Sequence, residues 1–454
     1  MQTIWANHAL LPSGWARNVL IEFDANGRIR TVQQDSPARG TQVPFLAPAP
    51  VNVHSHAFQR AMAGLTEQRG PNPSDSFWTW RQLMFRFLDR LTPDNIEAIT
   101  AFVQMEMLEA GYATNVEFHY LHHQPGGVPY DNIAEMSERV AAAASQTGIG
   151  LCLLPVHYEF GGCDGRNLAA GQIRFRNSID RFMTLHAAAG VALKSLPDDA
   201  NLGVAPHSLR AVGMADLKNY EYHFSTGPIH MHLAEQTAEV EEVEHHWRAR
   251  PVTWALDNMG IDERWCLIHC TQMTPDETIN LAASGAVAGL CPITESSLGD
   301  GIYDGVRWTD HGGRFAIGSD SNIRISLSEE LRTLDYSQRL RDGTRAALAT
   351  PDHSTGRRMF DSILKGGAQA AQRQTGRLEV GYWADMVSLD TTSEHLWARA
   401  EDAILDSWIF AGDDRLVSEV WSAGRHVVSN GIHIARSEIV AAYKQTLNSL
   451  KDAL

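Results

Sequence analysis

Cysteine is scarce in this chain of 454 residues. There are only five cysteines, and no two of them form a C-x-x-C pair. A small, odd number of cysteines without such a pair is typical of free thiols in a reducing compartment. The sequence therefore argues against a disulfide-stapled fold and favours unpaired, mostly buried thiols. Cys266 and Cys270 flank His269, which leaves a metal role for these two thiols as a weaker alternative.

Long hydrophobic runs are also missing. No stretch approaches the roughly 20 apolar residues that a membrane-spanning helix needs. The first residues, MQTIWANHALLPSGW, have neither the basic start nor the apolar core of a signal peptide. We therefore expect a cytoplasmic protein without a membrane segment.

Positive charge is in deficit. The chain has 38 Lys and Arg against 54 Asp and Glu, a net charge of −16. Nucleic-acid binding depends on cationic contacts to phosphate, so this balance argues against a nucleic-acid partner. A small anionic substrate stays compatible with it, because an acidic protein can still contain a local basic pocket.

The two ends of the chain read as short β-strands. ARNVLIEF and RIRTVQ flank Asn26-Gly27, and a second hairpin pattern surrounds Asn430-Gly431. Asn-Gly between alternating apolar residues is a strong hairpin signal. We predict one small β-sandwich domain that both termini build together, from residues 1–46 and 375–454.

The middle of the chain alternates between apolar strands and helical segments. A helix is predicted to open at Thr92-Pro93, where a capping residue precedes a proline. This alternation is typical of an α/β fold, and we predict a TIM-like (β/α)₈ barrel over residues 47–374. Its predicted strands are 45–54, 114–119, 149–156, 202–207, 228–235, 265–270, 286–292 and 314–320.

One connection, residues 57–92, is much longer than the others and contains the aromatic run FWTWRQLMFRF. Long loops in compact domains are usually functional or disordered, and this one is too apolar for disorder. It therefore predicts a lid over the site, with a packing insertion as the alternative.

Histidines and acids follow several of the predicted strands. In VNVHSHAFQR, His54 and His56 are two residues apart, so both imidazoles face one side of an extended strand. In such barrels the active site lies at the carboxyl ends of the strands. Other polar side chains occur at these ends, namely Glu117, His119, Tyr120, His207, Arg210, His232, Glu235, His269 and Asp320.

A lone histidine is more often a hydrogen-bonded structural residue than a ligand, but the repeated pattern reverses that expectation. We predict a metal site formed by His54, His56, His232 and Asp320. Three imidazoles and a carboxylate suit Zn²⁺, with iron as the alternative. Structural roles are expected for His157, His186, His223, His245, His246, His311 and His353, whereas His122 and His123 are weak site candidates.

The pattern resembles the amidohydrolase superfamily over the whole chain: H-x-H on strand one, histidines on strands five and six, and aspartate on strand eight. The usual Pro-Gly before strand one reads Ala-Pro-Ala-Pro here. Two-metal members have a lysine at the end of strand four, but here that strand ends in His207 and the nearest lysine, Lys194, precedes it. The resemblance therefore implies one metal per chain.

The segment HLAEQ is similar to the deaminase branch of that superfamily. The resemblance implies that Glu235 shuttles protons, His269 contacts the attacking water and Asp320 acts as base. We therefore take Glu235, His269 and Asp320 as the predicted catalytic residues.

A finer resemblance is to the N-formimino-L-glutamate deiminases of histidine breakdown, through FWTWRQLMF, EFHYLHH, APHSLRAV, HLAEQTAEVEE and CPITESSLGDG. It implies metal-dependent deamination of N-formimino-L-glutamate to N-formyl-L-glutamate and ammonia, in a homodimer. It also implies a set of substrate-binding residues: Gln59, Arg81, Tyr120, His207 and Arg210. Independently of the resemblance, the forked donors of Arg81 and Arg210 suit an acidic amino-acid substrate.

Two alternatives stay open. A purine base or nucleoside would suit the aromatic walls that Phe77, Trp78 and Trp80 offer, although such deaminases more often have Asn where this chain has Glu295. A catalytically silent scaffold is disfavoured, because no metal ligand of the pattern is lost.

Overall fold

The structure is a computed structural model, and it describes all residues except 66, 68–83, 86 and 452–454. Arg81 and the aromatic residues Phe77, Trp78 and Trp80 therefore lie outside the described residues. Half of the predicted lid, residues 57–92, lies outside them as well.

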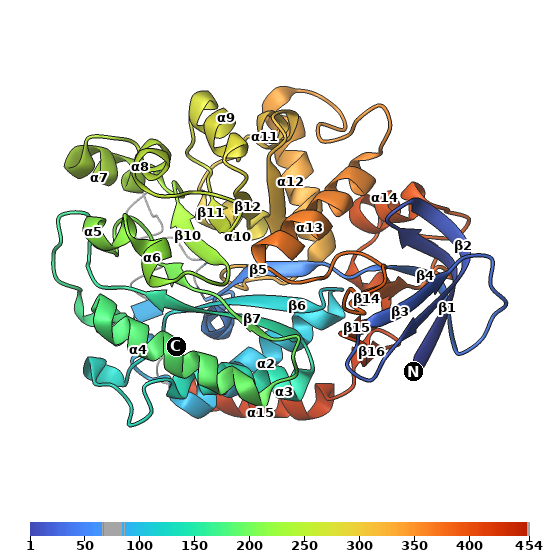
Figure 1. The fold of residues 1–454 in the computed structure, drawn as a ribbon, viewed down its shortest axis with the longest axis horizontal. Helices are drawn as coiled ribbons and strands as arrows, with labels where there is room; N and C mark the ends of the chain where they lie inside the picture. Colours follow the sequence, from blue (N-terminus) through green and yellow to red (C-terminus); the bar gives the residue numbers. More distant parts are fainter. Residues whose placement is uncertain (66, 68–83, 86, 452–454) are drawn as a thin grey trace.

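Parallel strands form a closed barrel in the middle of the chain (Figure 1). One run of strands ends at β8 and another begins at β10, and bridges at Val204–Ile229 and Ser55–Asp320 join the two runs at both edges. The predicted (β/α)₈ barrel is confirmed. Its strands are β5 (Val51–Ser55), β6 (Thr114–His119), β7 (Gly150–His157), β8 (Asn201–Leu202), β9 (Ala205–Pro206), β10 (Ile229–Leu233), β11 (Trp265–His269), β12 (Val287–Leu290) and β13 (Arg314–Ile317).

Helices surround these strands, and the predicted start of one is confirmed in detail. Helix α2 (Pro93–Glu109) begins after Thr92, whose side chain accepts a hydrogen bond from the backbone N–H of Asn95. The other helices of the barrel are α3 (Glu135–Thr147), α4 (Ile179–Ala192), α5 (Met214–Leu217), α6 (Tyr220–His223), α7 (Thr237–Trp247), α8 (Pro251–Asn258), α9 (Pro275–Ala283), α10 (Pro292–Leu298), α11 (Gly305–Asp310), α12 (Leu327–Asp342) and α13 (Thr355–Ala370). Short 3₁₀ turns are η1 (Ala57–Met62), η2 (Pro125–Gly127), η3 (Ala170–Phe175), η4 (Leu193–Ser195) and η5 (Asp414–Leu416).

The two ends of the chain form a second, eight-stranded sheet at one side of the barrel (Figure 1). Its strands follow the order β17-β16-β15-β14-β4-β1-β2-β3, so the N-terminal and C-terminal strands meet where β4 pairs with β14. The predicted β domain from both termini is thus confirmed. The strands are β1 (Gln2–Leu11), β2 (Gly14–Phe23), β3 (Ile29–Gln33), β4 (Thr41–Pro48), β14 (Met386–Leu389), β15 (Val417–Ser422), β16 (Arg425–Ser429) and β17 (Ile432–His433).

Two helices of the C-terminal stretch pack on the barrel. Helix α14 (Asp402–Phe410) lies against α12 and α13, and α15 (Arg436–Leu450) lies against α2. Trp408 and Leu450 therefore belong to the same hydrophobic cluster as the barrel residues. The division at residues 46/47 and 374/375 stays a prediction.

The segment predicted as one strand, 45–54, is divided between the two sheets. β4 ends at Pro48 in the small sheet, and β5 begins at Val51 in the barrel. Ala49 donates a backbone hydrogen bond to Asp385, and Pro50 accepts one from Ala113, so the chain changes partners here. Proline has no N–H for a ladder, which suits it to this crossing point.

A buried cluster of charges connects the barrel to the small sheet. Arg373, which follows α13, lies 3.0 Å from a carboxylate oxygen of Asp199 and 3.2 Å from one of Asp385. Arg425 on β16 contacts Asp199 with both guanidinium nitrogens, at 2.9 and 2.7 Å. The three side chains at the centre, Arg373, Asp199 and Asp385, are at most 3% exposed.

The charges set the protonation of Asp199. Burial on its own raises the pKa of this carboxyl, but the hydrogen bonds from Arg425 and the charge of Arg373 outweigh burial and lower the pKa. Stability from a carboxyl with a lowered pKa is present above its unfolded pKa, about 3.9, and is lost as pH falls through the folded value.

We expect Asp199→Asn to lower the free energy of unfolding at pH 7 by about 3–5 kcal/mol, because it leaves buried guanidinium groups short of a charge partner. The loss of stability below pH ~4 should be shallower in the variant than in the parent chain. Urea unfolding at several pH values measures both effects. Asp413→Asn, which changes an exposed pair with Arg415, should cost at most about 1 kcal/mol. Equal losses in the two variants would contradict this account.

No helix in the described part of the chain is long and apolar enough to cross a membrane.

Candidate metal centre and active site

The H-x-H motif lies where the barrel closes. His54 is the fourth residue of β5, His56 follows the strand, and both side chains are buried. The backbone N–H of His56 donates to the carbonyl of Asp320 at 2.9 Å, and the N–H of Asp320 donates to the carbonyl of His54 at 2.9 Å. This exchange fixes the ends of β5 and β13 beside each other.

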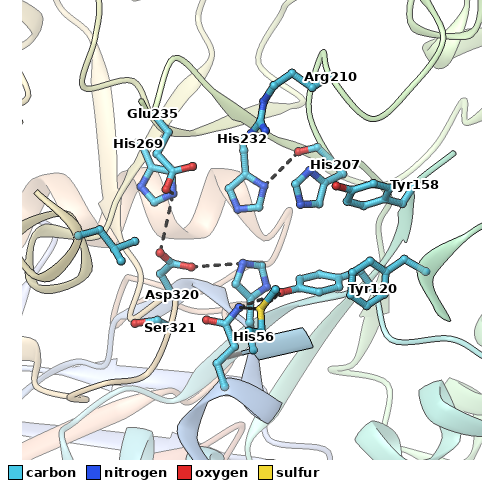
Figure 2. A pocket seen from close by; sticks show the side chains of 14 residues that line it. His56, Tyr120, Tyr158, His207, Arg210, His232, Glu235, His269, Asp320 and Ser321 are labelled. Atoms are coloured by element: carbon cyan, nitrogen blue, oxygen red, sulfur yellow. Dashed lines mark hydrogen bonds and ion pairs between the residues drawn. The ribbon is translucent and has the colours of Figure 1, made fainter. Parts of the chain in front are cut away.

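Four donor atoms converge at this point. Nε2 of His54 lies 3.0 Å from Nε2 of His232, and Oδ1 of Asp320 lies 3.2 Å from Nε2 of His56 and 3.5 Å from Nε2 of His54. One donor atom from each of the four residues lies within 4.8 Å of the others. Figure 2 shows His56, His232 and Asp320 facing one another.

Hydrogen bonds behind the rings fix which nitrogen faces the cluster. Nδ1 of His56 donates to the carbonyl of Phe118 at 3.0 Å, and Nδ1 of His232 donates to that of His207 at 3.1 Å. The Nε2 lone pairs therefore face inward. Burial lowers the pKa of His54 and His232 well below the ordinary value, so the imidazoles are neutral. Lone pairs and a carboxylate this close together fit a bound cation.

A second set of groups adjoins the first. Nε2 of His269 lies 3.7 Å from Oε1 of Glu235 and 3.8 Å from Oδ2 of Asp320, while its Nδ1 lies 3.2 Å from Oε1 of Glu295. Asp320 therefore faces the histidine cluster with one oxygen and His269 with the other. Burial on its own lowers the pKa of His269, but Glu235 and Glu295 outweigh burial and raise it well above the ordinary value.

Backbone strain explains how His269 reaches this position. In the parallel register of β10 and β11, His269 pairs with Leu233 rather than with His232. A regular strand would thus place its ring on the face of Leu233. Instead His269 has φ +73°, and its ring stacks on that of His232 with centroids 5.6 Å apart. Ala234 and Asp320 also have positive φ, a conformation that costs non-glycine residues energy and is typical of functional sites.

A pocket opens over both sets. Figure 2 shows Glu235, His269 and Asp320 on one side, and Tyr120, Tyr158 and His207 on the other. Gln59 of η1 donates to the hydroxyl of Tyr120 at 2.8 Å. The Nε of Arg210 is buried and has no hydrogen-bond partner among the described residues. The other lining residues are His56, Met84, Phe175, His232, Leu298 and Ser321.

Comparison with known proteins gives this arrangement a family. The model of the amidohydrolase family matches residues 45–427. The chain belongs to the amidohydrolase family. The model of the N-terminal domain of formimidoylglutamate deiminase HutF matches residues 1–42 of this amidohydrolase. It is 44% identical over 459 residues to formimidoylglutamate deiminase from Pseudomonas aeruginosa, covering 100% of both chains.

Solved structures agree with the fold of this amidohydrolase. An amidohydrolase from Brucella melitensis matches with a TM-score of 0.95 and 43% identity, covering 99% of this chain and 100% of that chain. An adenosine deaminase from Xanthomonas campestris with bound zinc matches with a TM-score of 0.82, covering 99% and 98%. At 20% identity, that second likeness shows the fold alone.

The structure brings most of the predicted site residues of this amidohydrolase to one place. All four predicted metal ligands form one cluster, and Glu235 and His269 adjoin it. Gln59, Tyr120, His207 and Arg210 line the pocket, whereas Arg81 lies outside the described residues. The roles assigned to these residues stay predictions.

Other candidates have structural positions. Nε2 of His122 donates a hydrogen bond to the carbonyl of Val156, and Nε2 of His123 forms hydrogen bonds with the carbonyl of Arg176 and the side chain of Asn177. Neither histidine lines the pocket. Cys266 and Cys270 are free, buried thiols, and neither belongs to a group of potential ligands found among the described residues.

Two acids near the centre were missed as site residues by the sequence reasoning. Glu295 accepts a hydrogen bond from the backbone N–H of Cys291 and contacts His269, and Asp300 lies beside Glu235 and His269. Glu295 lies in α10 and Asp300 lies just after it, both beyond the end of β12. There is no strand pattern in this region from which the direction of a side chain could be predicted.

We expect the purified protein to bind one metal ion per chain and His232→Asn to lose at least nine-tenths of it, because the variant removes one of the converging donors. Elemental analysis after dialysis measures this. His119→Asn is the matched control, since His119 also ends a strand and is buried but does not belong to the cluster. Metal loss in the control, or retention in His232→Asn, would contradict the assignment.

Proposed function

We propose that this chain hydrolyses N-formimino-L-glutamate to N-formyl-L-glutamate and ammonia, a step of histidine degradation. The observation that carries the proposal is the full-length relationship to the P. aeruginosa deiminase, at 44% identity. The separate match of residues 1–42 supports it, because these residues lie in the small sheet, outside the barrel.

The pocket suits a substrate with carboxylates. Arg210 lines it beside His207, and the donors of a guanidinium match the two oxygens of a carboxylate. Gln59 and Tyr120, which are joined by a hydrogen bond, supply further polar groups to the pocket. We therefore assign substrate binding to Gln59, Tyr120, His207 and Arg210, together with Arg81 as the sequence predicts.

The converging donors fit a single Zn²⁺, with iron as the alternative, held by His54, His56, His232 and Asp320. When bound, such an ion lowers the pKa of a water molecule to about 7 and so supplies a nucleophile at neutral pH.

The protein's own groups divide the proton transfers. Oδ2 of Asp320, which faces His269, accepts a proton from the attacking water. The cationic ring of His269 orients that water and stabilises the negative charge that develops in the transition state. Glu235, whose pKa burial raises above the ordinary carboxyl range, carries a proton to the terminal nitrogen.

The balance of the reaction is simple. The water oxygen bonds to the formimino carbon, the bond from that carbon to the terminal nitrogen breaks, and both water protons leave with the nitrogen as ammonia. Fixing the substrate carboxylates holds the carbon near the nucleophile, an orientation effect that reaches about 7–11 kcal/mol at best.

A purine aminohydrolase is the second candidate. The aromatic rings of Tyr120, Tyr158 and Phe175 line the pocket and could enclose a flat base. The chemistry would be the same, so only the substrate separates the two candidates. A homodimer and a cytoplasmic location also stay predictions.

The test is incubation of the metal-loaded protein with N-formimino-L-glutamate, guanine and adenosine in parallel. We expect Glu235→Gln to lower kcat on N-formimino-L-glutamate by about 10²–10⁴-fold, because a proton carrier is lost. Ammonia and formylglutamate assays measure turnover. The metal content of Glu235→Gln should stay at one ion per chain. The control is Glu241→Gln, at an exposed position on α7, which should change neither kcat nor metal content. Metal loss in Glu235→Gln would show that the role given to Glu235 is wrong.

We expect Arg210→Met to raise the KM for N-formimino-L-glutamate by about 10–100-fold, because a charged hydrogen bond to a carboxylate contributes about 1.5–3 kcal/mol. Steady-state kinetics measure the effect, and kcat should change less. Arg166→Met removes a half-exposed guanidinium outside the pocket and is the control. An unchanged KM, or ammonia only from a purine, would contradict the carboxylate contact.

A further inference from the structure

Asp300 occupies a fixed, buried position behind the pocket. It follows Gly299, which ends α10 with φ +73°, and the residue is 2% exposed. Its backbone N–H donates to the carbonyl of Glu295 at 3.0 Å. The amide nitrogen of Gln236 donates to Oδ1, and that of Gln272 donates to its backbone carbonyl. Two glutamines from neighbouring loops thus hold it in place.

The carboxyl of Asp300 adjoins the proton carrier. One of its oxygens, an oxygen of Glu235 and a ring nitrogen of His269 lie within 4.8 Å of one another. Oδ1 accepts from Gln236, but Oδ2 is buried and has no hydrogen-bond partner among the described residues. A small side-chain rotation, or one shared water molecule, is enough to connect the carboxyl groups of Asp300 and Glu235 at this separation.

The charges around Asp300 favour its neutral form. Glu235 after β10, Glu295 on α10 and Asp320 after β13 are acidic, and His269 at the end of β11 is the cation that faces it. No Lys or Arg in the described residues forms an ion pair with Asp300. Two buried carboxylates this close cannot both ionise cheaply, so the pair retains a proton near neutral pH. Burial, followed by the charge of Glu235, raises the pKa of Asp300.

We propose that Asp300, in its neutral form, donates a hydrogen bond from Oδ2 to the carboxylate of Glu235 and is a positioning residue for the reaction. The inference rests on the proposed function, because it gives Glu235 its orientation for proton transfer. The donated hydrogen bond stabilises Glu235 as an anion that can accept a proton. Asp300 neither gains nor loses a proton over the full reaction.

Two substitutions separate this role from a structural one. In Asp300→Asn the amide oxygen can still accept from Gln236, while the N–H group donates toward Glu235 and cannot ionise. In Asp300→Ala the donor is gone. At pH 7 we expect the asparagine variant to retain kcat within about threefold and the alanine variant to lose about 10–100-fold. KM and metal content should change in neither.

The pH profile adds a readout that a structural role would not move. The kcat of the parent chain should fall at alkaline pH as Asp300 ionises, and in Asp300→Asn the fall should begin at a higher pH, where only the cationic His269 loses its proton. Asp304→Asn, the same change four residues along at the N-cap of α11, should keep the parent profile. The proposal is overturned if Asp300→Asn is as inactive as Asp300→Ala, or if its alkaline fall begins at the same pH as that of the parent chain.

Infrared spectroscopy tests the proton without a substrate. At pH 7 the parent and Asp304→Asn should show a protonated carboxyl band that Asp300→Asn lacks. If the parent releases no ammonia from any substrate, the proposed function fails, and this band alone decides the protonation of Asp300. An unchanged band in Asp300→Asn would overturn the inference even in an active enzyme.

Discussion

Closure of the barrel between β5 and β13 is the constraint on which the site depends. The backbone groups of His54, His56 and Asp320 exchange hydrogen bonds across this junction. The same three residues supply side chains to the donor cluster. The junction of β5 and β13 therefore both closes the barrel and forms the metal centre. A shift of strand register at this junction would change the fold and the chemistry together.

Such a centre is intrinsically unstable as protein alone. Neutral imidazoles lie within hydrogen-bonding distance of each other, acids accumulate around His269, and Ala234, His269, Cys270 and Asp320 have positive φ at or after strand ends. Each feature costs stability, and the large buried core of the barrel offsets the cost. This division is typical of enzymes, in which a rigid scaffold holds a strained set of polar groups.

The sequence predicted the parts of the site that follow regular strands. His54, His56 and Asp320 could be placed because apolar runs precede them and because side chains two residues apart in a strand share a face. The separation of β4 from β5 at Ala49-Pro50 was not predicted, because both halves are equally apolar and only their partners differ. Glu295 and Asp300 were missed for a related reason: their roles come from contacts with His269 and Glu235, which are distant in sequence.

The pairing of β4 with β14 has a consequence for synthesis on the ribosome. The first 48 residues can form the ordered strands β4-β1-β2-β3, but the outer edge of β4 has no partner until Met386 and Val387 have emerged. More than three hundred residues of barrel separate the two strands in the chain. During this interval the nascent protein has an open β edge, the kind of surface that pairs with other chains.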